Sequence, residues 1–80
     1  MNTKEAVAKR ILELCTERAL SVNALANRSG VSPSTIYSML NEKSKNPVVV
    51  SLKKLCDGLE ISIRIFFDSE LFDDLEQEIQ

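Results

Sequence analysis

The sequence lacks the residues from which metal and redox sites are usually built. It contains no histidine, and its two cysteines, Cys15 and Cys56, lie far apart with no second thiol near either one. Zinc sites draw closely spaced ligands from cysteine, histidine and carboxylates, and disulfide exchange commonly uses a CxxC pair. Neither pattern is present, so we expect no metal ion and no cofactor.

The two cysteines are also poorly placed for a structural disulfide, which would be unusual in a reducing cytoplasm. Both residues fall on the apolar stripes of predicted helices. A free cysteine on such a stripe behaves as a small hydrophobic residue. We therefore predict two buried and unreactive thiols.

Long apolar runs and catalytic groupings are absent as well. No apolar run approaches the ~18 residues of a membrane span, and residues 1–10 lack the apolar block of a secretory signal. A chain of 80 residues builds one small core rather than a deep catalytic cleft. The chain also lacks paired carboxylates placed to flank a cleft and a phosphate-binding glycine loop. We expect a cytoplasmic protein that is neither an enzyme nor a membrane protein.

Charge is distributed unevenly along the chain, whose formal net charge is -2. Residues 68–80 hold six acids and no base, whereas residues 1–67 hold ten bases against six acids. Five of the bases and only one acid fall between Arg28 and Lys54. Local positive charge of this kind favours a nucleic-acid partner, although charge alone fits a solvated surface equally well. We divide the chain into a domain over residues 1–67 and an acidic amphipathic extension over residues 68–80.

Apolar residues at helical spacing predict an all-α fold of five helices. The predicted helices cover residues 3–19, 22–29, 33–41, about 48–59 and 62–67. Val48 to Val50 also fit a buried strand, but the following leucines restore the helical period, so a fourth helix is favoured. Gly58 weakens the last turn of that helix. An apolar stripe at helical spacing continues through the acidic extension, which predicts a short helical tail.

The second and third predicted helices form a helix-turn-helix. Ser21 and Ser32 are suited to cap the two helices, Gly30 tolerates a left-handed helix end, and Pro33 fits a first helical position. Two short helices joined by a tight turn with glycine cross steeply, which leaves one face of the second helix uncovered by the core. Such a face fits the ~12 Å wide major groove of double-stranded DNA.

The uncovered face of residues 33–41 carries small or hydrogen-bonding side chains, whereas Ile36, Met39 and Leu40 point inward. Short hydroxyl and amide side chains allow the helix backbone to approach base edges closely. The outward residues are Pro33, Ser34, Thr35, Tyr37, Ser38 and Asn41. We expect these residues to contact DNA.

Several short fragments carry a family resemblance through their joint spacing. They are Leu25-Ala26, Gly30-Val31-Ser32, Thr35-Ile36, the loop from Lys43 to Pro47, and Leu52 to Leu59. Over roughly residues 5–67 they resemble the Cro/cI-type (xenobiotic-response-element) helix-turn-helix family. The resemblance implies a compact five-helix DNA-binding domain of a bacterial or phage transcriptional regulator, which we expect to be a repressor.

The same resemblance implies roles for individual residues. Ser34 and Ser38 match base-reading positions of the family, and Pro33 matches one in location. The residues that match positions near the DNA backbone are Asn41, Lys43, Lys45 and Asn46, together with Val22 and Asn23 at the start of the second helix.

Two departures from the family pattern narrow the expected reading surface. Many relatives have glutamine at the positions of Val22 and Pro33, and neither residue can make the contacts of a glutamine. Specificity should therefore rest on Ser34, Tyr37 and Ser38, with the basic loop residues and the backbone of the second helix holding the phosphates.

Two further departures concern packing. Relatives often carry an arginine and a glutamate where this chain has Cys15 and Leu40, and replacing both charges together avoids a stranded buried charge. We predict that Cys15 packs against Leu40. Glu42 stands where relatives commonly have the glycine that ends the third helix, so we expect Asn41 to adopt the left-handed conformation instead.

The aromatic and acidic C-terminal region admits three interpretations. Its apolar residues can close the small core, or some of them can form a two-fold homodimer contact that sets two recognition helices about one DNA turn apart. Its acidic face can also dock onto a basic partner or repel DNA. A second functional hypothesis follows from Val22, Pro33 and the net negative charge: an antitoxin-like or regulatory protein-interaction module that has lost DNA affinity.

Overall fold

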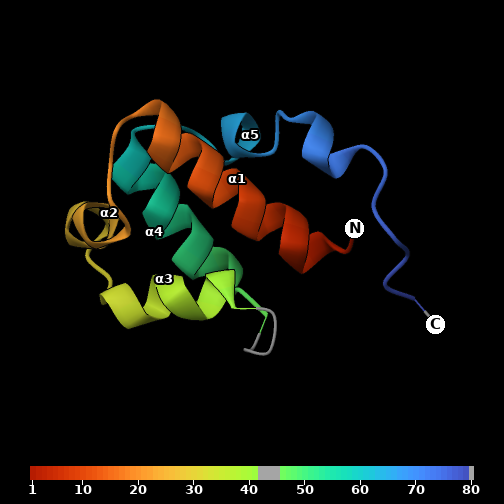
Figure 1. Ribbon diagram of the computed structural model, residues 1–80, viewed down its shortest axis with the longest axis horizontal. Coiled ribbons are helices and arrows are strands. Elements are labelled where there is room, and N and C mark those ends of the chain that lie inside the picture. Colours follow the sequence, from red (N-terminus) through yellow and green to blue (C-terminus); the bar gives the residue numbers. More distant parts are fainter. Residues whose placement is uncertain (42–45, 80) are drawn as a thin grey trace.

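The computed structural model describes residues 1–41 and 46–79 and contains five α-helices in this range. The helices are α1 (Thr3–Glu17), α2 (Val22–Ser29), α3 (Pro33–Leu40), α4 (Val49–Leu59) and α5 (Ile63–Phe66), followed by the 3-10 turn η1 (Glu70–Phe72) (Figure 1). No strand occurs in the described residues, and the segment after Val48 is helical. The predicted all-α fold of five helices is confirmed.

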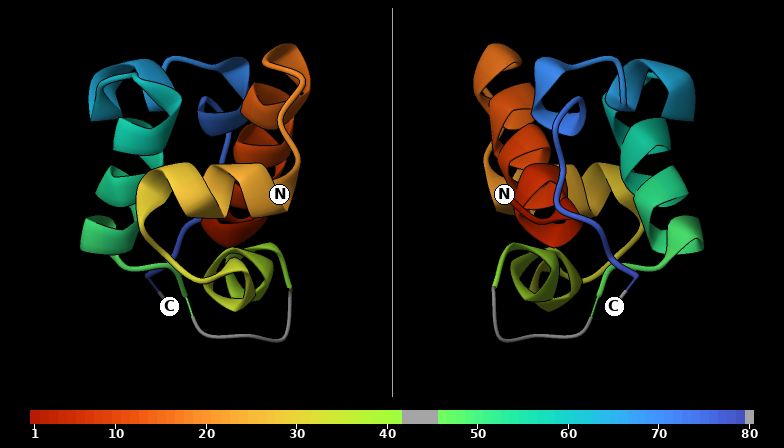
Figure 2. Two further views of the ribbon diagram at one scale, coloured as in Figure 1. Left: turned by 90° about the vertical axis from the view of Figure 1, so that its left-hand side faces the viewer. Right: turned by 90° about the vertical axis from the view of Figure 1, so that its right-hand side faces the viewer.

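The helices are arranged so that α3 lies at one edge of the molecule. In Figure 2, α1 and α4 stand as two uprights, α2 crosses them on one side, and α3 lies below. Contacts join α2 to both α3 and α4, whereas α1 contacts α3 and η1. α3 is therefore held from above by α1 and α2.

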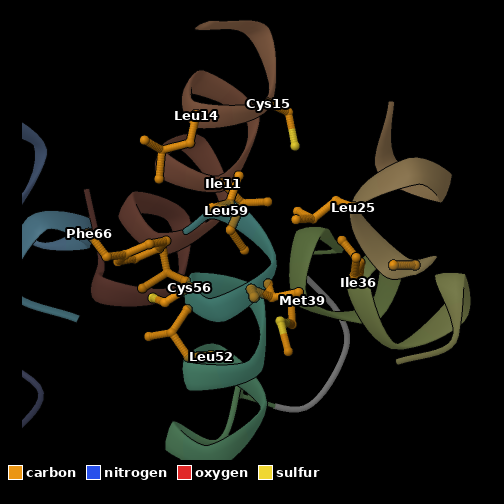
Figure 3. Packing of buried hydrophobic residues seen from close by; sticks show 13 residues of the cluster. Ile11, Leu14, Cys15, Leu25, Ile36, Met39, Leu52, Cys56, Leu59 and Phe66 are labelled. Carbon is orange, nitrogen blue, oxygen red and sulfur yellow. The ribbon is translucent and has the colours of Figure 1, made fainter. Parts of the chain in front are cut away.

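One apolar core joins all five helices. Phe66 of α5 and Leu55 of α4 are completely buried, and Ile36 and Met39 bring the inner face of α3 into the same cluster. Figure 3 shows Phe66 of α5 and Ile36 and Met39 of α3 converging on Ile11 and Leu59. Because Ile36 and Met39 are fixed in this core, the opposite face of α3 has to point outward.

The crossing of α2 over α4 is unusually close at one point. A Cβ atom added at Gly58 would lie 2.2 Å from Oγ of Ser29 and 3.1 Å from its backbone nitrogen. The absence of a side chain at Gly58 therefore allows α2 and α4 to pack closely, even though glycine lowers the helix propensity of α4. The hydroxyl of Ser29 is buried at this contact and has no hydrogen-bond partner among the described residues.

A buried arginine links α1 to the end of α5. Only 8% of Arg10 is exposed; its Nε donates to the carbonyl oxygen of Phe66 at 2.7 Å, and a terminal nitrogen donates to that of Ile65 at 3.0 Å. The guanidinium also pairs with Glu13. The guanidinium thus supplies the described donor to the Phe66 carbonyl and a further donor to the Ile65 carbonyl at the end of α5.

The prediction of a helical tail is wrong beyond η1. Residues 73–79 form no helix and instead run along the N-terminal end of α1, where the amide of Glu76 donates to the Met1 carbonyl at 3.2 Å (Figure 1). A helix would set several carboxylates three or four residues apart with no base between them, which is unfavourable. The non-helical tail avoids this repulsion and gains contacts with α1.

Aromatic residues at the start of the tail close the core. Phe66 is buried, Phe72 packs on the core from η1, and the rings of Phe67 and Phe72 meet edge to face with centroids 4.8 Å apart. The interpretation that aromatic residues complete the core holds for Phe66 and Phe72. Phe67 keeps 39% of its surface exposed.

The end of α3 differs from the prediction. Asn41 has φ -89° and ψ 123°, so its backbone is extended and the expected left-handed conformation is absent. A left-handed residue usually ends a helix by turning later amides back onto the last carbonyls. At the end of α3 the Asn41 carbonyl accepts a hydrogen bond from the ammonium group of Lys4, which lies in α1.

Neither Cys15 nor Leu40 is exposed to solvent. Cys15 is buried, and Leu40 is half-buried where it lines a groove with Ala8 and Leu12 of α1. Direct packing of Cys15 on Leu40 stays a prediction.

Both cysteines are free and buried, and we expect them to resist thiol reagents in the folded protein. Desolvation raises the pKa of each thiol, opposed by Arg18 at Cys15 and by Lys53 at Cys56. The thiolate is the reactive form, so labelling at neutral pH should be slow without urea and complete in urea.

The raised thiol pKa values also predict how stability depends on pH. Unfolded thiols ionise near pH ~8.5. Because the unfolded chain then loses protons first, the free energy of unfolding should fall as pH rises above this value.

A double Cys15→Ala, Cys56→Ala variant is the control for the alkaline loss, since it removes both thiols. Its free energy of unfolding should depend less on pH above ~8.5 than that of the parent. Rapid labelling of the native parent would contradict the burial of the thiols.

None of the helices in the described part of the chain is long and apolar enough to cross a lipid bilayer.

Candidate nucleic-acid interface

The outward face of α3 is built by the same packing that fixes its inner face. Pro33, Ser34, Tyr37 and Ser38 are exposed, and Tyr37 has 54% of its surface accessible. Thr35 is half-buried at the side of the helix. The structure therefore brings the predicted reading residues of α3 onto one continuous face that carries three hydroxyl groups and no charge.

The turn before α3 follows the sequence signals closely. Ser21 caps α2 by accepting from the amide of Ala24 at 3.0 Å, and Gly30 ends α2 with φ 68°. The amide of Val31 then donates to the carbonyl of Ala26 at 3.2 Å. In the left view of Figure 2, α2 is seen lengthwise and α3 nearly end-on, so the two helices cross steeply as a helix-turn-helix requires.

The first turn of α3 differs from the expected cap. The side chain of Ser32 makes no capping bond to an amide. Its Oγ lies 3.0 Å from Oγ of Ser34 and 3.0 Å from Oγ1 of Thr35, and Pro33 occupies the first helical position. The hydroxyl of Ser34 is thus oriented within the protein while its residue remains exposed.

The start of α2 separates two residues that were predicted together. Val22 is half-buried and packs against the core, whereas Asn23 is exposed. Asn23 is therefore the side chain of this pair that faces outward.

The far end of α3 holds the remaining candidates. Asn41 and Asn46 are both exposed. Lys43 and Lys45 lie outside the described residues, as does Glu42. Sequence reasoning missed Lys4, which reaches the Asn41 carbonyl from α1. No signal near Lys4 in the sequence points to this contact, because it depends on how α1 packs on α3.

The positive charge counted around the helix-turn-helix is partly neutralised. Lys53 forms an ion pair with Asp57 one turn further along α4. Arg28 and Lys54 are exposed on α2 and α4. The exposed face of α3 itself is polar and uncharged.

Comparison with known proteins decides the family. A model of the Cro/C1-type HTH DNA-binding domain matches residues 10–64, which span α2, α3 and α4 completely. The chain belongs to the Cro/C1-type helix-turn-helix family. The resemblance predicted from the sequence is therefore confirmed, and this Cro/C1-type protein is a DNA-binding regulator.

Two solved structures are similar to this chain. The prophage Lp1 protein 11 is 33% identical to this Cro/C1-type chain, with a TM-score of 0.81 over 94% of this chain and 100% of that one. The restriction-modification controller protein C.Esp1396I is 26% identical, with a TM-score of 0.72 over 80% of this chain and 81% of its own. No match to a curated protein emerged.

Proposed function

We propose that this protein is a sequence-specific transcriptional repressor that places α3 in the major groove of its operator. The observation that carries the proposal is the face of α3, where exposed Ser34, Tyr37 and Ser38 stand opposite buried Ile36 and Met39. Hydroxyl groups both donate and accept hydrogen bonds at base edges. The similar controller protein C.Esp1396I supports a regulatory role.

The other candidates have roles around this helix. Pro33 offers only apolar contact, since it has no N–H group. Asn23 and the backbone at the start of α2 face one stretch of the DNA backbone, and Asn41 and Asn46 face another. We assign Lys43 and Lys45 to phosphates on the basis of the sequence alone.

We further propose that the protein binds as a homodimer through its C-terminal region. Ile65 is 50% exposed and Phe67 is 39% exposed, although both are apolar and adjacent to the buried Phe66. A two-fold contact there would cover this apolar surface and present two copies of α3 to two half-sites. The spacing of half-sites in selected DNA would report such a dimer.

Binding sites should be selected from a random DNA pool, and Ser38→Ala should then weaken binding to the selected site about tenfold, since one base contact is lost. Binding to unrelated DNA should not change, because that binding rests on phosphate contacts. Thr16→Ala is the matched control, as Thr16 is exposed on α1 and outside the proposed interface. Fluorescence anisotropy with labelled duplexes measures both dissociation constants.

Salt dependence separates the two functional hypotheses. A DNA-binding regulator should lose affinity steadily as salt rises, because bound counterions are released from the DNA. No retention of DNA even at ~50 mM salt would contradict the regulator and favour the protein-interaction module. Equal effects of Ser38→Ala on selected and unrelated DNA would contradict base reading by α3.

A further inference from the structure

The acidic tail is attached to the N-terminal end of α1 by its last acids. The backbone amide of Glu76 donates to the Met1 carbonyl at 3.2 Å, and Oε2 of Glu78 accepts from the amide of Thr3 at 3.4 Å. The first amides of a helix favour a nearby negative charge through the helix dipole. The carboxylate of Glu78 therefore has a physical reason to lie at this end of α1.

This attachment places Glu78 beside the segment that leads into α4. Glu78 lines one hollow with Asn46, Pro47 and the first turn of α1, including Lys4. Lys4 in turn donates to the carbonyl of Asn41. In Figure 2 the tail descends past α1 to the level of α3. The end of the tail thus lies next to Asn46, and Lys4 connects the same hollow to Asn41.

Electrostatics at this position oppose DNA. The tail has six acids and no base, while residues 1–67 carry a net positive charge. Charges closer than a Debye length of ~8–10 Å interact with little screening at physiological salt. Phosphates that approach Asn46 would therefore meet the carboxylate of Glu78, whereas that of Glu76 pairs with the Met1 ammonium group at 3.2 Å. The positive charge of the domain attracts both the tail and the DNA.

The tail is held weakly enough to be displaced. Residues 73–79 are held by the exposed hydrogen bond from Thr3 to Glu78 and by the ion pair of Glu76 with the Met1 ammonium group, and Ile79 keeps 83% of its surface accessible. Exposed hydrogen bonds and ion pairs contribute little to stability. Opening of residues 73–79 from α1 therefore leaves Phe72 and the apolar core in place.

We propose that the end of the tail is an intramolecular competitor of the DNA backbone, which lowers affinity at the edge of the interface formed by Asn41 and Asn46. The proposal rests on the DNA-binding function proposed above. It goes beyond that function by making the affinity depend on whether the tail is attached to α1. DNA that binds this edge has to displace Glu78.

Neutralising the last acids tests this proposal in the full chain. Glu76→Gln with Glu78→Gln should tighten binding to the selected duplex about fivefold at ~50 mM salt, and the gain should shrink at ~200 mM salt as the repulsion is screened. Glu70→Gln with Asp73→Asn is the matched control, because it removes two charges from η1 and its end, away from Asn46. We expect less than a twofold change for the control.

A second measurement follows the tail itself in the unchanged protein. Hydrogen exchange of the Glu76 amide should become faster when saturating duplex is added, since its bond to Met1 is broken. Equal gains for both variant pairs, no gain for Glu76→Gln with Glu78→Gln, or unchanged exchange at Glu76 would overturn the proposal. Failure of every variant and of the parent to bind DNA at ~50 mM salt would instead refute the DNA-binding function itself.

Discussion

Arg10→Ala should lower the free energy of unfolding by about 3 kcal/mol or more, which is the largest effect we expect from a single substitution. The change removes two hydrogen bonds to the carbonyls of Phe66 and Ile65 and leaves a cavity in their place. The Ile65 carbonyl also accepts from the amide of Asp68, whereas Arg10 is the described donor to the Phe66 carbonyl. A buried carbonyl without a partner is therefore the main cost.

Such a loss is large for a small domain, whose total stability is only about 5–10 kcal/mol. The melting temperature should fall by roughly 12–24 °C, since each kcal/mol corresponds to about 4–8 °C at this size. Urea and thermal unfolding followed by circular dichroism at ~222 nm, where helices absorb, measure both quantities.

Two variants separate the hydrogen bonds of Arg10 from its ion pair. Glu13→Gln breaks the pair with Arg10 but keeps both carbonyl contacts, and Glu13 is well exposed, so we expect a loss below about 1 kcal/mol. Arg10→Lys keeps the charge with a single ammonium group and should be intermediate. If Arg10→Ala destabilised the protein no more than Glu13→Gln, the carbonyl contacts would not be the source of stability.

Gly58→Ala should destabilise the protein by about 1–3 kcal/mol, as an overpacked helix crossing does. In an open helix the same change would stabilise by about 1 kcal/mol, because alanine is the better helix former. The sign of the effect therefore reports the packing. The new Cβ would meet both the hydroxyl and the backbone of Ser29, and only the hydroxyl can rotate away.

Ser29→Ala provides the matched control. Alone it should be neutral or slightly stabilising, because it removes a buried hydroxyl that has no described partner. Combined with Gly58→Ala it should recover part of the lost stability, since the shortest contact is gone while the backbone contact at 3.1 Å remains. Urea midpoints of the four proteins give the coupling, and a Gly58→Ala protein more stable than its parent would contradict the close crossing.

Features set by neighbouring residues could be predicted from the sequence. Ser21, Gly30 and Pro33 act within one or two turns of the backbone, so the helix-turn-helix and its boundaries follow from local chemistry. The alternation of Ile36 and Met39 with exposed residues likewise determines which face of α3 points outward. These signals determine the candidate interface because α3 is short and its inner face is apolar.

Features set by distant residues could not be predicted in the same way. Arg10 is buried because it donates hydrogen bonds to carbonyls more than fifty positions away. The backbone of Asn41 is extended, and its carbonyl accepts a hydrogen bond from Lys4 of another helix. The tail has a helical apolar period, but attachment to α1 and repulsion among its acids decide its conformation. The predicted cap by the Ser32 side chain does not form, because the hydroxyls of Ser34 and Thr35 take its oxygen as a partner.

The attachment of the tail to α1 has a consequence for the order of folding. The bond between Thr3 and Glu78 joins residues 75 positions apart, so forming it early would close almost the whole chain into a loop. Contacts between residues far apart in sequence form slowly because closing a long loop costs entropy. Contacts between successive helices such as α2 and α3 form faster. We therefore expect the helix-turn-helix to assemble first and the tail to close last. We expect opening of the tail to be the local unfolding event with the lowest free energy, and it exposes the edge at Asn46 without global unfolding.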